Sequence, residues 1–200
     1  MFTGIITHIG RVEDVRDGEG LRDIVVATDL PLDEVALGAS VAHSGVCLTV
    51  VEKMPGAFRV QASPETLART TLGSWRPGTR INLERSLRLG DELDGHLVFG
   101  HVDAVGEIVG LAQVGETWRL EVAVPKSLAP LLAVKGSVAV DGISLTVNEA
   151  AVDRFACTII PHTWTHTTLC DRRVGDRVNL EADMLARYVA RQAALAREQG

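Results

Sequence analysis

One motif occurs twice in this chain. Residues 40–50 read SVAHSGVCLTV and residues 137–147 read SVAVDGISLTV, so seven of eleven aligned positions are identical at a shift of 97 residues. Unrelated segments of this length would share about one identity, which makes the two stretches copies of one sequence unit. The chain is therefore expected to fold as a duplicated structure.

The repeat covers most of the chain. Residues 64–84 align with residues 161–181 at the same shift, and eleven of the twenty-one pairs are identical. The opening residues align at a shift of 96, which pairs Gly4, Ile6, Ile9, Gly10 and Val12 with Gly100, Val102, Val105, Gly106 and Ile108. A solenoid would need three or more short units. We therefore predict two domains, 1–96 and 97–182, followed by a tail, 183–200.

Each copy contains six short β-branched runs separated by Gly, Pro and Asp turns. No helix of ordinary length interrupts either set, which excludes βαβ packing and favours closed antiparallel sheets. The sequence predicts an all-β fold of two tandem six-stranded β-barrels with short helices and a C-terminal helix. The expected strands are 5–12, 23–28, 40–42, 47–52, 58–62 and 80–84, then 102–109, 118–124, 137–140, 144–149, 155–160 and 177–181.

Short helices are expected between the strands. They cover residues 31–36 and 64–70, with twins at 126–133 and from Pro161. Ser63 before Pro64 is a candidate N-cap with proline at the first helical position. Only the tail has no twin, and its Leu185, Tyr188 and Val189 lie near one helical face. A helix with an apolar stripe outside both barrels is a candidate for packing against other subunits.

Charge and composition exclude several classes of partner. The net charge is −6, from 26 acidic and 20 basic residues, and no Lys/Arg stripe occurs, so nucleic acid is not an expected partner. No apolar run approaches membrane-spanning length, and the opening MFTGIITHIG lacks the features of a secretion signal. Three cysteines form no even disulfide framework. A cytoplasmic location without membrane contact is expected.

The two copies differ at a few polar positions. Cys47 aligns with Ser144, Ile5 with His101, and Ser86 with Asp183, while Lys135 has no cationic counterpart. Such differences suit a protein that holds two copies of one ligand in different chemical roles. Each residue also has a structural interpretation. Cys47 can be a small core residue, His101 a strand histidine, Asp183 an N-cap paired with Arg187, and Lys135 a solvated turn residue.

Four further side chains are of zinc-ligand types, namely Cys157, His162, His166 and Cys170. Their partners in the first copy are Val60, Glu65, Arg69 and Gly73. A structural metal shared by the two barrels would have left ligands in both copies. No metal site is therefore predicted.

Several motifs together resemble the riboflavin synthase family of the alpha-chain type, which is built from two lumazine-binding repeats. They are the opening MFTGII, the SVAHSGVCLTV and SVAVDGISLTV pair, the segment GHLVFGHV, and the twin PET…TTLG and PHT…TTLC blocks. The resemblance implies Greek-key barrels and dismutation of two 6,7-dimethyl-8-ribityllumazine molecules into riboflavin and 5-amino-6-ribitylaminouracil. It implies no metal or organic cofactor.

The resemblance also implies partners and a competing function. It implies a homotrimer around the C-terminal helices, with active sites between subunits, and raises an association with lumazine synthase that the sequence cannot show. The alternative is a non-catalytic lumazine- or flavin-binding protein of the antenna type. Because the second copy keeps Ser144 and Thr146 and adds His101, Lys135 and Asp183, we expect an enzyme.

The family's ligand-contacting segments carry over to specific positions. We hypothesise that His101 with Thr146 transfers protons, that Cys47 and Ser144 polarise the ring or add to it, that Phe2 packs on the ligand, and that Asp183 and Lys135 orient one ligand. Further binding residues implied in the first half are Gly4, Ile5, Ile6, Ser40, Leu48, Thr49, Gln61, Ala62, Ser63, Pro64, Glu65 and Thr66. Those implied in the second half are Gly100, Val102, Leu145, Thr158, Ile159, Ile160, Pro161, His162 and Thr163.

Overall fold

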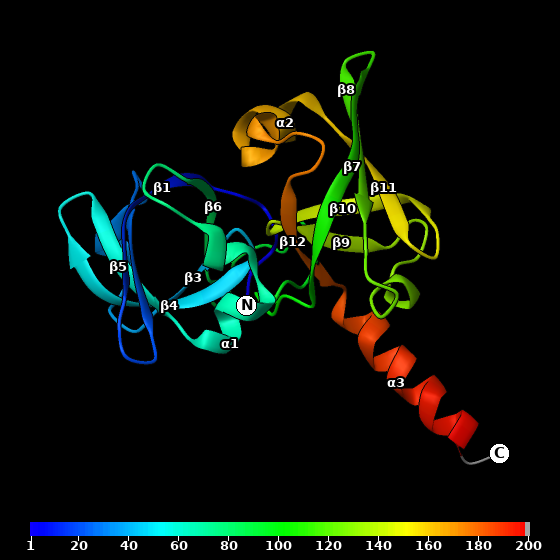
Figure 1. Cartoon of the computed structure of the whole chain (residues 1–200), viewed down its shortest axis with the longest axis horizontal. Coiled ribbons are helices and arrows are strands. Elements are labelled where there is room, and N and C mark those ends of the chain that lie inside the picture. The colour runs from blue at the N-terminus through cyan, green and yellow to red at the C-terminus, as the bar shows by residue number, and fades with distance from the viewer. Residues whose placement is uncertain (199–200) are drawn as a thin grey trace.

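Two β-barrels lie side by side, and one long helix extends away from the second barrel (Figure 1). The structure is a computed structural model that describes residues 1–198. The end of the predicted tail segment 183–200, at residues 199–200, lies outside the described residues. The prediction of two tandem six-stranded barrels with short helices and a C-terminal helix is confirmed.

The two barrels contain the same elements in the same order. The first comprises β1 His8–Asp17, β2 Arg22–Ala27, η1 Leu32–Glu34, β3 Ser40–His43, β4 Val46–Met54, β5 Ala57–Ala62, α1 Pro64–Arg69, η2 Thr71–Ser74 and β6 Arg80–Arg85. The second comprises β7 Ala104–Val114, β8 Thr117–Ala123, η3 Ala129–Leu131, β9 Ser137–Val140, β10 Ile143–Ala150, β11 Arg154–Ile159, α2 Pro161–His166, η4 Thr168–Asp171 and β12 Arg177–Ala182. The helix α3 Met184–Glu198 follows.

Each barrel is a closed antiparallel sheet with Greek-key connections. The first closes in the order β1-β2-β5-β4-β3-β6, and the second closes in the equivalent order β7-β8-β11-β10-β9-β12. Neither β2 and β3 nor β5 and β6 are neighbours, so the chain between them must pass over an end of the barrel. The short helices η1 and α1 lie in these two connections.

Alternation of side chains fills the barrel interiors. In β5, Phe58, Val60 and Ala62 are fully buried, whereas Arg59 and Gln61 between them are half-buried on the outer face. The register shifts after Val12 in β1 and after Ile108 in β7, at equivalent positions. Such bulges bend a strand, which a small closed barrel requires.

Local sequence signals explain the short helix α1. The Ser63 hydroxyl oxygen accepts a hydrogen bond from the Thr66 backbone N–H at 3.2 Å, and Pro64 occupies the first helical turn. The predicted N-cap is confirmed. The equivalent Ile160 before α2 has no side chain that can cap, so the second helix relies on Pro161 alone.

The first strand of each barrel begins later than the sequence predicted. Strand β1 starts at His8 rather than Ile5, and β7 starts at Ala104 rather than Val102. The residues just before the predicted strand starts bond to the opposite barrel, since the Gly4 carbonyl accepts from Ser144 N–H of β10 at 2.8 Å and the Gly100 carbonyl accepts from Cys47 N–H of β4 at 3.0 Å. Thr7 N–H, immediately before β1, already donates to the Leu83 carbonyl of its own barrel.

The barrels meet at two tight hairpin turns. Gly45 of the β3–β4 turn and Gly142 of the β9–β10 turn have φ of +80° and +79°. A Cβ on either glycine would lie 2.7 Å from the backbone nitrogen of the other. Only glycine permits both this left-handed backbone and this close approach.

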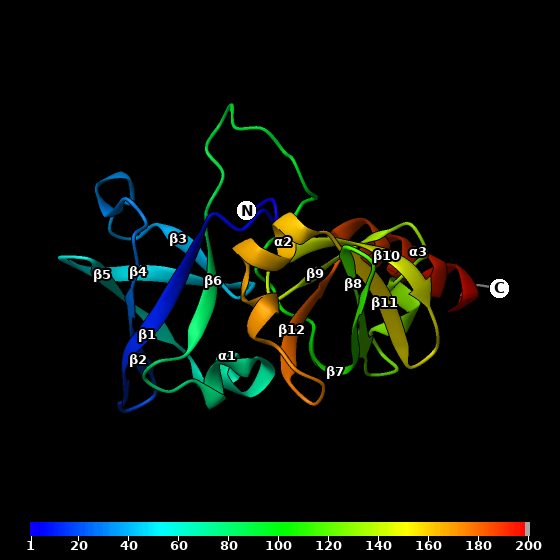
Figure 2. The same cartoon turned by 90° about the horizontal axis from the view of Figure 1, so that it is seen from above.

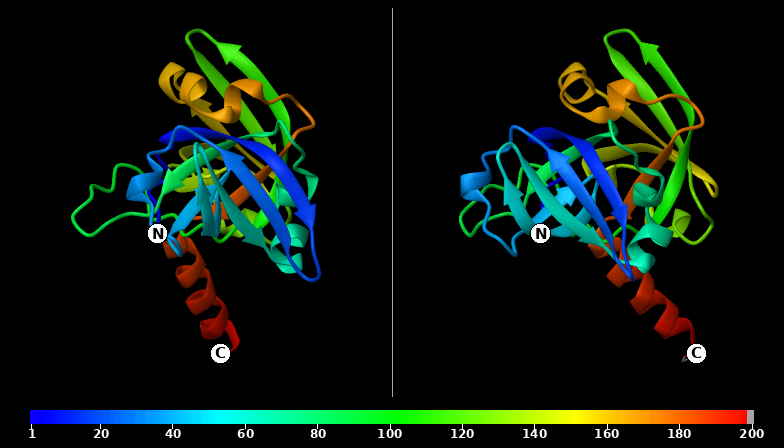
Figure 3. Two further views of the ribbon diagram at one scale, coloured as in Figure 1. Left: turned by 90° about the vertical axis from the view of Figure 1, so that its left-hand side faces the viewer. Right: turned by 60° about the vertical axis from the view of Figure 1, so that its left-hand side comes forward.

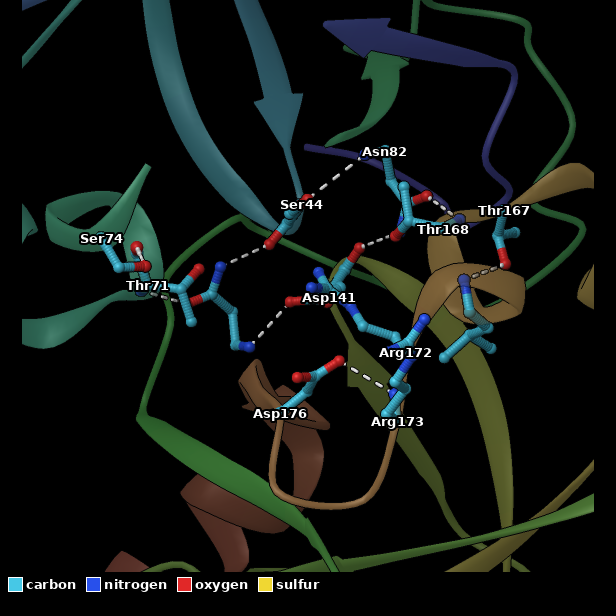
Figure 4. Close-up of polar contacts among 12 residues, drawn as sticks. Ser44, Thr71, Ser74, Asn82, Asp141, Thr167, Thr168, Arg172, Arg173 and Asp176 are labelled. Carbon is cyan, nitrogen blue, oxygen red and sulfur yellow. Dashed lines mark hydrogen bonds and ion pairs between the residues drawn. The ribbon is translucent and has the colours of Figure 1, made fainter. Parts of the chain in front are cut away.

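Two equivalent asparagines cross-link the barrels (Figure 4). In β6, Asn82 donates to the Asp141 carbonyl at 2.9 Å and accepts from Thr168 N–H at 2.8 Å. In β12, Asn179 makes the matching bonds, donating to the Ser44 carbonyl and accepting from Thr71 N–H, both at 2.8 Å. Each amide thereby satisfies backbone groups of the other barrel, which fixes their relative position.

The helix α3 leaves the body of the molecule (Figure 3), and apolar side chains on it are exposed. Leu185, Tyr188 and Val189 are 67%, 65% and 69% exposed. Its start is capped by Asp183, whose carboxylate accepts from Leu185 N–H at 2.9 Å. The N-cap of the structural interpretation is thus present, but the Asp183–Arg187 pair that accompanied it is wrong, because the Arg187 guanidinium binds Asp103 at 3.0 Å.

None of the helices in residues 1–198 has the length and apolar character needed to span a membrane.

A buried histidine in the first barrel should make the protein sensitive to acid. His43 is fully buried against Phe58, and burial lowers its pKa from 6.5 to about 4. As the pH falls below 6.5, the unfolded chain takes up a proton that the folded chain rejects until about pH 4. Folding stability is therefore lost over this window, by about 2.5 kcal/mol between pH 7 and pH 4.5.

The second copy supplies the matched variant, because Val140 occupies the position of His43. Between pH 7 and pH 4.5, we expect the free energy of unfolding of His43→Val to fall by about 2 to 3 kcal/mol less than that of the unaltered protein. Urea unfolding at pH 7 and pH 4.5 measures both free energies. An unchanged pH dependence in the variant would show that His43 does not titrate between its folded and unfolded states.

The glycine contact between the barrels gives a second prediction. Gly45→Ala should lower the free energy of unfolding by about 1 to 3 kcal/mol more than Gly38→Ala, because the added Cβ at position 45 must displace the backbone of the other barrel. Gly38 is the control, since it has φ of +84° and no atom within 4 Å of an added Cβ. Both variants carry the same left-handed backbone strain. Equal unfolding free energies would contradict the close contact.

Candidate active site

A pocket of about 430 Å³ opens beside Cys47 in the first barrel. It is bounded by the start of β4, by α1 and by the segment that precedes β7. Ten residues line it, namely Val46, Cys47, Glu65, Thr66, Arg69, Thr70, Gly100, His101, Val102 and Asp103. Three groups of residues predicted from sequence, around Cys47, Glu65 and His101, therefore meet in one place.

The opening segments of the two copies are exchanged between the barrels. Cys47 N–H donates to the Gly100 carbonyl at 3.0 Å, and Ser144 N–H donates to the Gly4 carbonyl at 2.8 Å. Val102 packs against the core of the first barrel, whereas Ile6 packs against the core of the second. The Cys47 pocket is thus completed by residues that belong to the other copy in sequence, and the Ser144 backbone is contacted in the equivalent way by Gly4.

Glycine is required where each exchanged segment crosses the opposite strand. A Cβ on Gly100 would lie 2.5 Å from the Cβ of Cys47, and a Cβ on Gly4 would lie 2.6 Å from the Cβ of Ser144. Both glycines also have positive φ, at +74° and +77°. The two segments therefore lie directly on the residues that differ between the copies.

Two buried glutamates hold the exchanged segments. Glu84 accepts from Thr3 N–H at 2.6 Å and from Gly4 N–H at 2.9 Å, and Glu181 accepts from Phe99 N–H at 2.8 Å and His101 N–H at 2.9 Å. Burial raises the pKa of both carboxyls, while these hydrogen bonds oppose it. Sequence reasoning missed both residues, although a charged residue identical in both copies was a usable signal.

Several other predicted residues of the first barrel are not among those that line the Cys47 pocket. Thr49 is exposed and pairs with Ser40 across β3 and β4, whereas Leu48 and Ala62 are buried in the barrel interior. The Gln61 amide donates to Asp23 at 2.9 Å on the outer face. Ser63 is used as the cap of α1, where Pro64 is exposed.

The second barrel places its predicted residues at equivalent positions. Ser144 is half-buried on β10, Thr146 and the turn residue Lys135 are exposed, and Leu145 points into the interior. Beyond β11, Ile160 and Pro161 at the start of α2 are exposed, as is His162. The remaining predicted positions are Thr158, which is exposed, Ile159, which is buried, Thr163, which is half-buried, and Ile5, which is 43% exposed.

One chain does not bring His101 and Thr146 into one pocket. His101 is exposed beside Cys47, and Thr146 is not among the residues that line that pocket. In the repeat, Thr146 matches Thr49 and His101 matches Ile5. A pair formed by these two residues would therefore need the first barrel of one chain and the second barrel of another.

Phe2 lies between the barrels rather than at the pocket surface. Its side chain is fully buried, and it belongs to a small apolar cluster with Ala42, Val98 and Ala139, against which Cys47 packs. Its backbone pairs with Val98 at 2.7 and 3.0 Å. In a single chain, the buried cluster that contains Phe2 thus packs against Cys47.

The side chains of zinc-ligand type are dispersed. Cys157 is buried within the second barrel, where burial raises the pKa of its thiol to about 12, and Cys170 is exposed. The rings of His162 and His166 stack with centroids 4.1 Å apart. Within residues 1–198, no three His, Cys, Asp or Glu side chains are grouped so that they could hold a metal ion.

Known proteins resemble this chain over nearly its whole length. The family model described as the lumazine binding domain matches residues 3–86 and 99–183. The riboflavin synthase of Brucella abortus (strain 2308) is 51% identical over 199 residues, covering 96% of this chain and 98% of that protein. The riboflavin synthase of Photobacterium leiognathi is 42% identical over 190 residues, covering 94% and 87%.

Two solved structures share the fold. The crystal structure of LumP complexed with riboflavin superposes with a TM-score of 0.83 at 20% identity, covering 91% of this chain and 99% of that chain. The crystal structure of LumP complexed with 6,7-dimethyl-8-(1'-D-ribityl) lumazine superposes with a TM-score of 0.81 at 19% identity, with the same coverage. Identity this low relates the folds alone.

Proposed function

This chain belongs to the riboflavin synthase family and is an enzyme of the transferase class, and we propose that each of its two barrels holds one of the two reacting substrates. The reaction is the dismutation of two 6,7-dimethyl-8-ribityllumazine molecules. A four-carbon unit passes from one to the other, which gives riboflavin and 5-amino-6-ribitylaminouracil.

The exchange of the opening segments is the observation that carries this proposal. In each barrel, a segment of the other copy lies across a strand at a glycine and is held by a buried glutamate. The two barrels are equivalent in this respect, but their reactive groups differ. The first barrel holds Cys47 beside His101. At the second, Ser144 lies under the segment that carries Ile5. Two similar sites with different reactive groups suit a reaction in which one molecule of a compound is the donor and a second molecule of the same compound is the acceptor.

The chemistry demands little from the protein. The 7-methyl group of the lumazine is an acidic carbon, because its anion delocalises into the ring, so a positioned weak base is sufficient. In this proposal His101 is that base and Cys47 polarises the ring. Holding donor and acceptor face to face supplies up to roughly 7 to 11 kcal/mol of the barrier reduction. The proposed reaction needs neither a metal nor an organic cofactor.

Recognition of a neutral polyol ligand would rest on backbone groups and hydroxyls. At the first barrel, backbone amides and carbonyls near Ala62 and Thr66 would form hydrogen bonds with the pyrimidinedione edge of the ligand. Hydroxyls such as those of Ser40 and Thr49 would contact the ribityl chain. At the second barrel, Thr146 and Thr163 take the equivalent places, and Lys135 and Asp183 orient one ligand only.

The complete active site would lie between two chains. His101 and Thr146 belong to the pockets of different barrels, so we place the first barrel of one subunit against the second barrel of its neighbour. The exposed Leu185, Tyr188 and Val189 on α3 support a homotrimer assembled around this helix. A cytoplasmic location remains a prediction from the sequence, and an association with lumazine synthase remains an implication of the family resemblance.

A non-catalytic antenna-type function is less well supported. LumP shares the fold at 19–20% identity, whereas the riboflavin synthases of Brucella abortus and Photobacterium leiognathi are 51% and 42% identical. The second barrel also retains hydroxyls at Ser144 and Thr146 on β10.

Incubation of the purified chain with 6,7-dimethyl-8-ribityllumazine, without added metal or cofactor, tests the activity directly. Riboflavin should form at half the rate at which the lumazine disappears, because two substrate molecules give one product. Absorbance follows both compounds. Tight lumazine binding without turnover would instead identify an antenna-type protein.

The role of His101 has its own test. His101→Gln should lower kcat by about a hundredfold, within the usual range for loss of an acid–base group, and change lumazine affinity only slightly. His8→Gln is the control, since His8 lies outside the pocket and contacts Thr7. Equal losses of turnover and binding would reject proton transfer by His101.

A further inference from the structure

A second histidine lies beside the reactive position of the second barrel. The Nδ1 atom of His96 is 2.7 Å from the Ser144 hydroxyl oxygen, and His96 N–H donates to the Thr3 carbonyl at 3.1 Å. The linker between β6 and β7, residues 86–103, loops out from the barrels and returns to them (Figure 2), and His96 lies within it. Sequence reasoning used this residue only as a domain boundary.

The neighbouring residue allows this close approach. A Cβ on Gly95 would lie 2.1 Å from the Thr3 carbonyl oxygen and 3.1 Å from the Ser144 hydroxyl oxygen. The linker therefore lies directly over both residues. Any other amino acid at this position would lift the linker and break the contact between His96 and Ser144.

The imidazole of His96 is neutral at neutral pH. Only 8% of the residue is exposed, and burial lowers the pKa of the ring, while the negative charge of Asp183 opposes that shift. Its Nε2 atom is buried without a partner among the described residues. The hydrogen bond to Ser144 is thus the single polar contact of the ring, and one of the two groups must donate to the other.

The first barrel differs at the equivalent position. Cys47, which occupies the position of Ser144, instead lines an open pocket. The reactive group of the second barrel is therefore held by the linker, whereas that of the first barrel is free.

We propose that His96 is a positioning residue, whose Nδ1 accepts the Ser144 hydroxyl proton in a hydrogen bond and so turns an oxygen lone pair of Ser144 toward the ligand of the second barrel. The inference rests on the proposed function of Ser144. In this arrangement the ring carries its proton on Nε2, which leaves Nδ1 free to accept. The Ser144 hydroxyl oxygen can then accept a hydrogen bond from the ligand in a fixed direction.

Variants at this position separate the hydrogen bond from simple packing. His96→Leu removes the acceptor and keeps the apolar contacts, and it should lower kcat by about tenfold to a hundredfold, as expected for one lost hydrogen bond at a buried site. The KM should change little. His96→Asn restores an acceptor close to the place of Nδ1 and should recover most of the turnover, whereas His96→Gln places its amide near Nε2 and should not.

A double-mutant cycle identifies the partner. Ser144→Ala should lower kcat about as much as His96→Leu, and the double variant should lose no more than either single variant, because both remove the same interaction. In the matched cycle, His96→Leu and Cys47→Ala should act independently, so that their effects on kcat multiply. Additive losses for His96 and Ser144 in an active enzyme would overturn the role of His96 and leave the proposed function intact.

A measurement without turnover keeps the inference testable if a variant fails to fold. In the unaltered protein labelled with nitrogen-15, NMR of the His96 ring should show Nε2 protonated and Nδ1 unprotonated at pH 7. A proton on Nδ1 would overturn the inference whatever the activity. Absence of riboflavin formation by the unaltered chain would instead overturn the proposed function.

Discussion

The contact on which this structure depends is the hydrogen bond that each exchanged segment makes to the opposite barrel. The Gly4 carbonyl accepts from Ser144 N–H, and the Gly100 carbonyl accepts from Cys47 N–H. Around these bonds lie the glutamates that hold the segments and the asparagines that join the barrels. All of them satisfy backbone groups buried between the barrels, which would be costly to leave unpaired. The arrangement of both pockets follows from this requirement.

A nearly symmetric scaffold carries asymmetric chemistry. Two pairs of residues that build the contact between the barrels are identical in the two copies, namely Asn82 with Asn179 and Glu84 with Glu181. The residues that differ lie on that scaffold, where Cys47 stands for Ser144. Identity is therefore found where the two barrels make matching contacts. His96 adds a further difference, because its ring hydrogen-bonds Ser144 of the second barrel.

The sequence predicted the parts of the fold that depend on local pattern. Alternating β-branched runs located the strands, and Ser63 with Pro64 located the start of α1. It did not predict the exchange of segments, because an alignment of two copies cannot tell whether an opening segment lies on its own barrel or on the other. It also missed His96, since a contact over 48 positions leaves no local signal. The Asp183–Arg187 pair was wrong, because helical spacing cannot reveal that Asp103 is the partner of Arg187.

The exchanged segments also constrain the order in which the chain can reach its native state. Residues 2–6 are synthesised well before the strand that accepts them, since β10 ends at Ala150. The first barrel likewise has to await Gly100 before the backbone beside Cys47 is satisfied. Contacts between residues so distant in sequence form slowly, because a long loop must close before they contribute. Neither half can therefore complete its interior surfaces during synthesis until much of the other half has emerged.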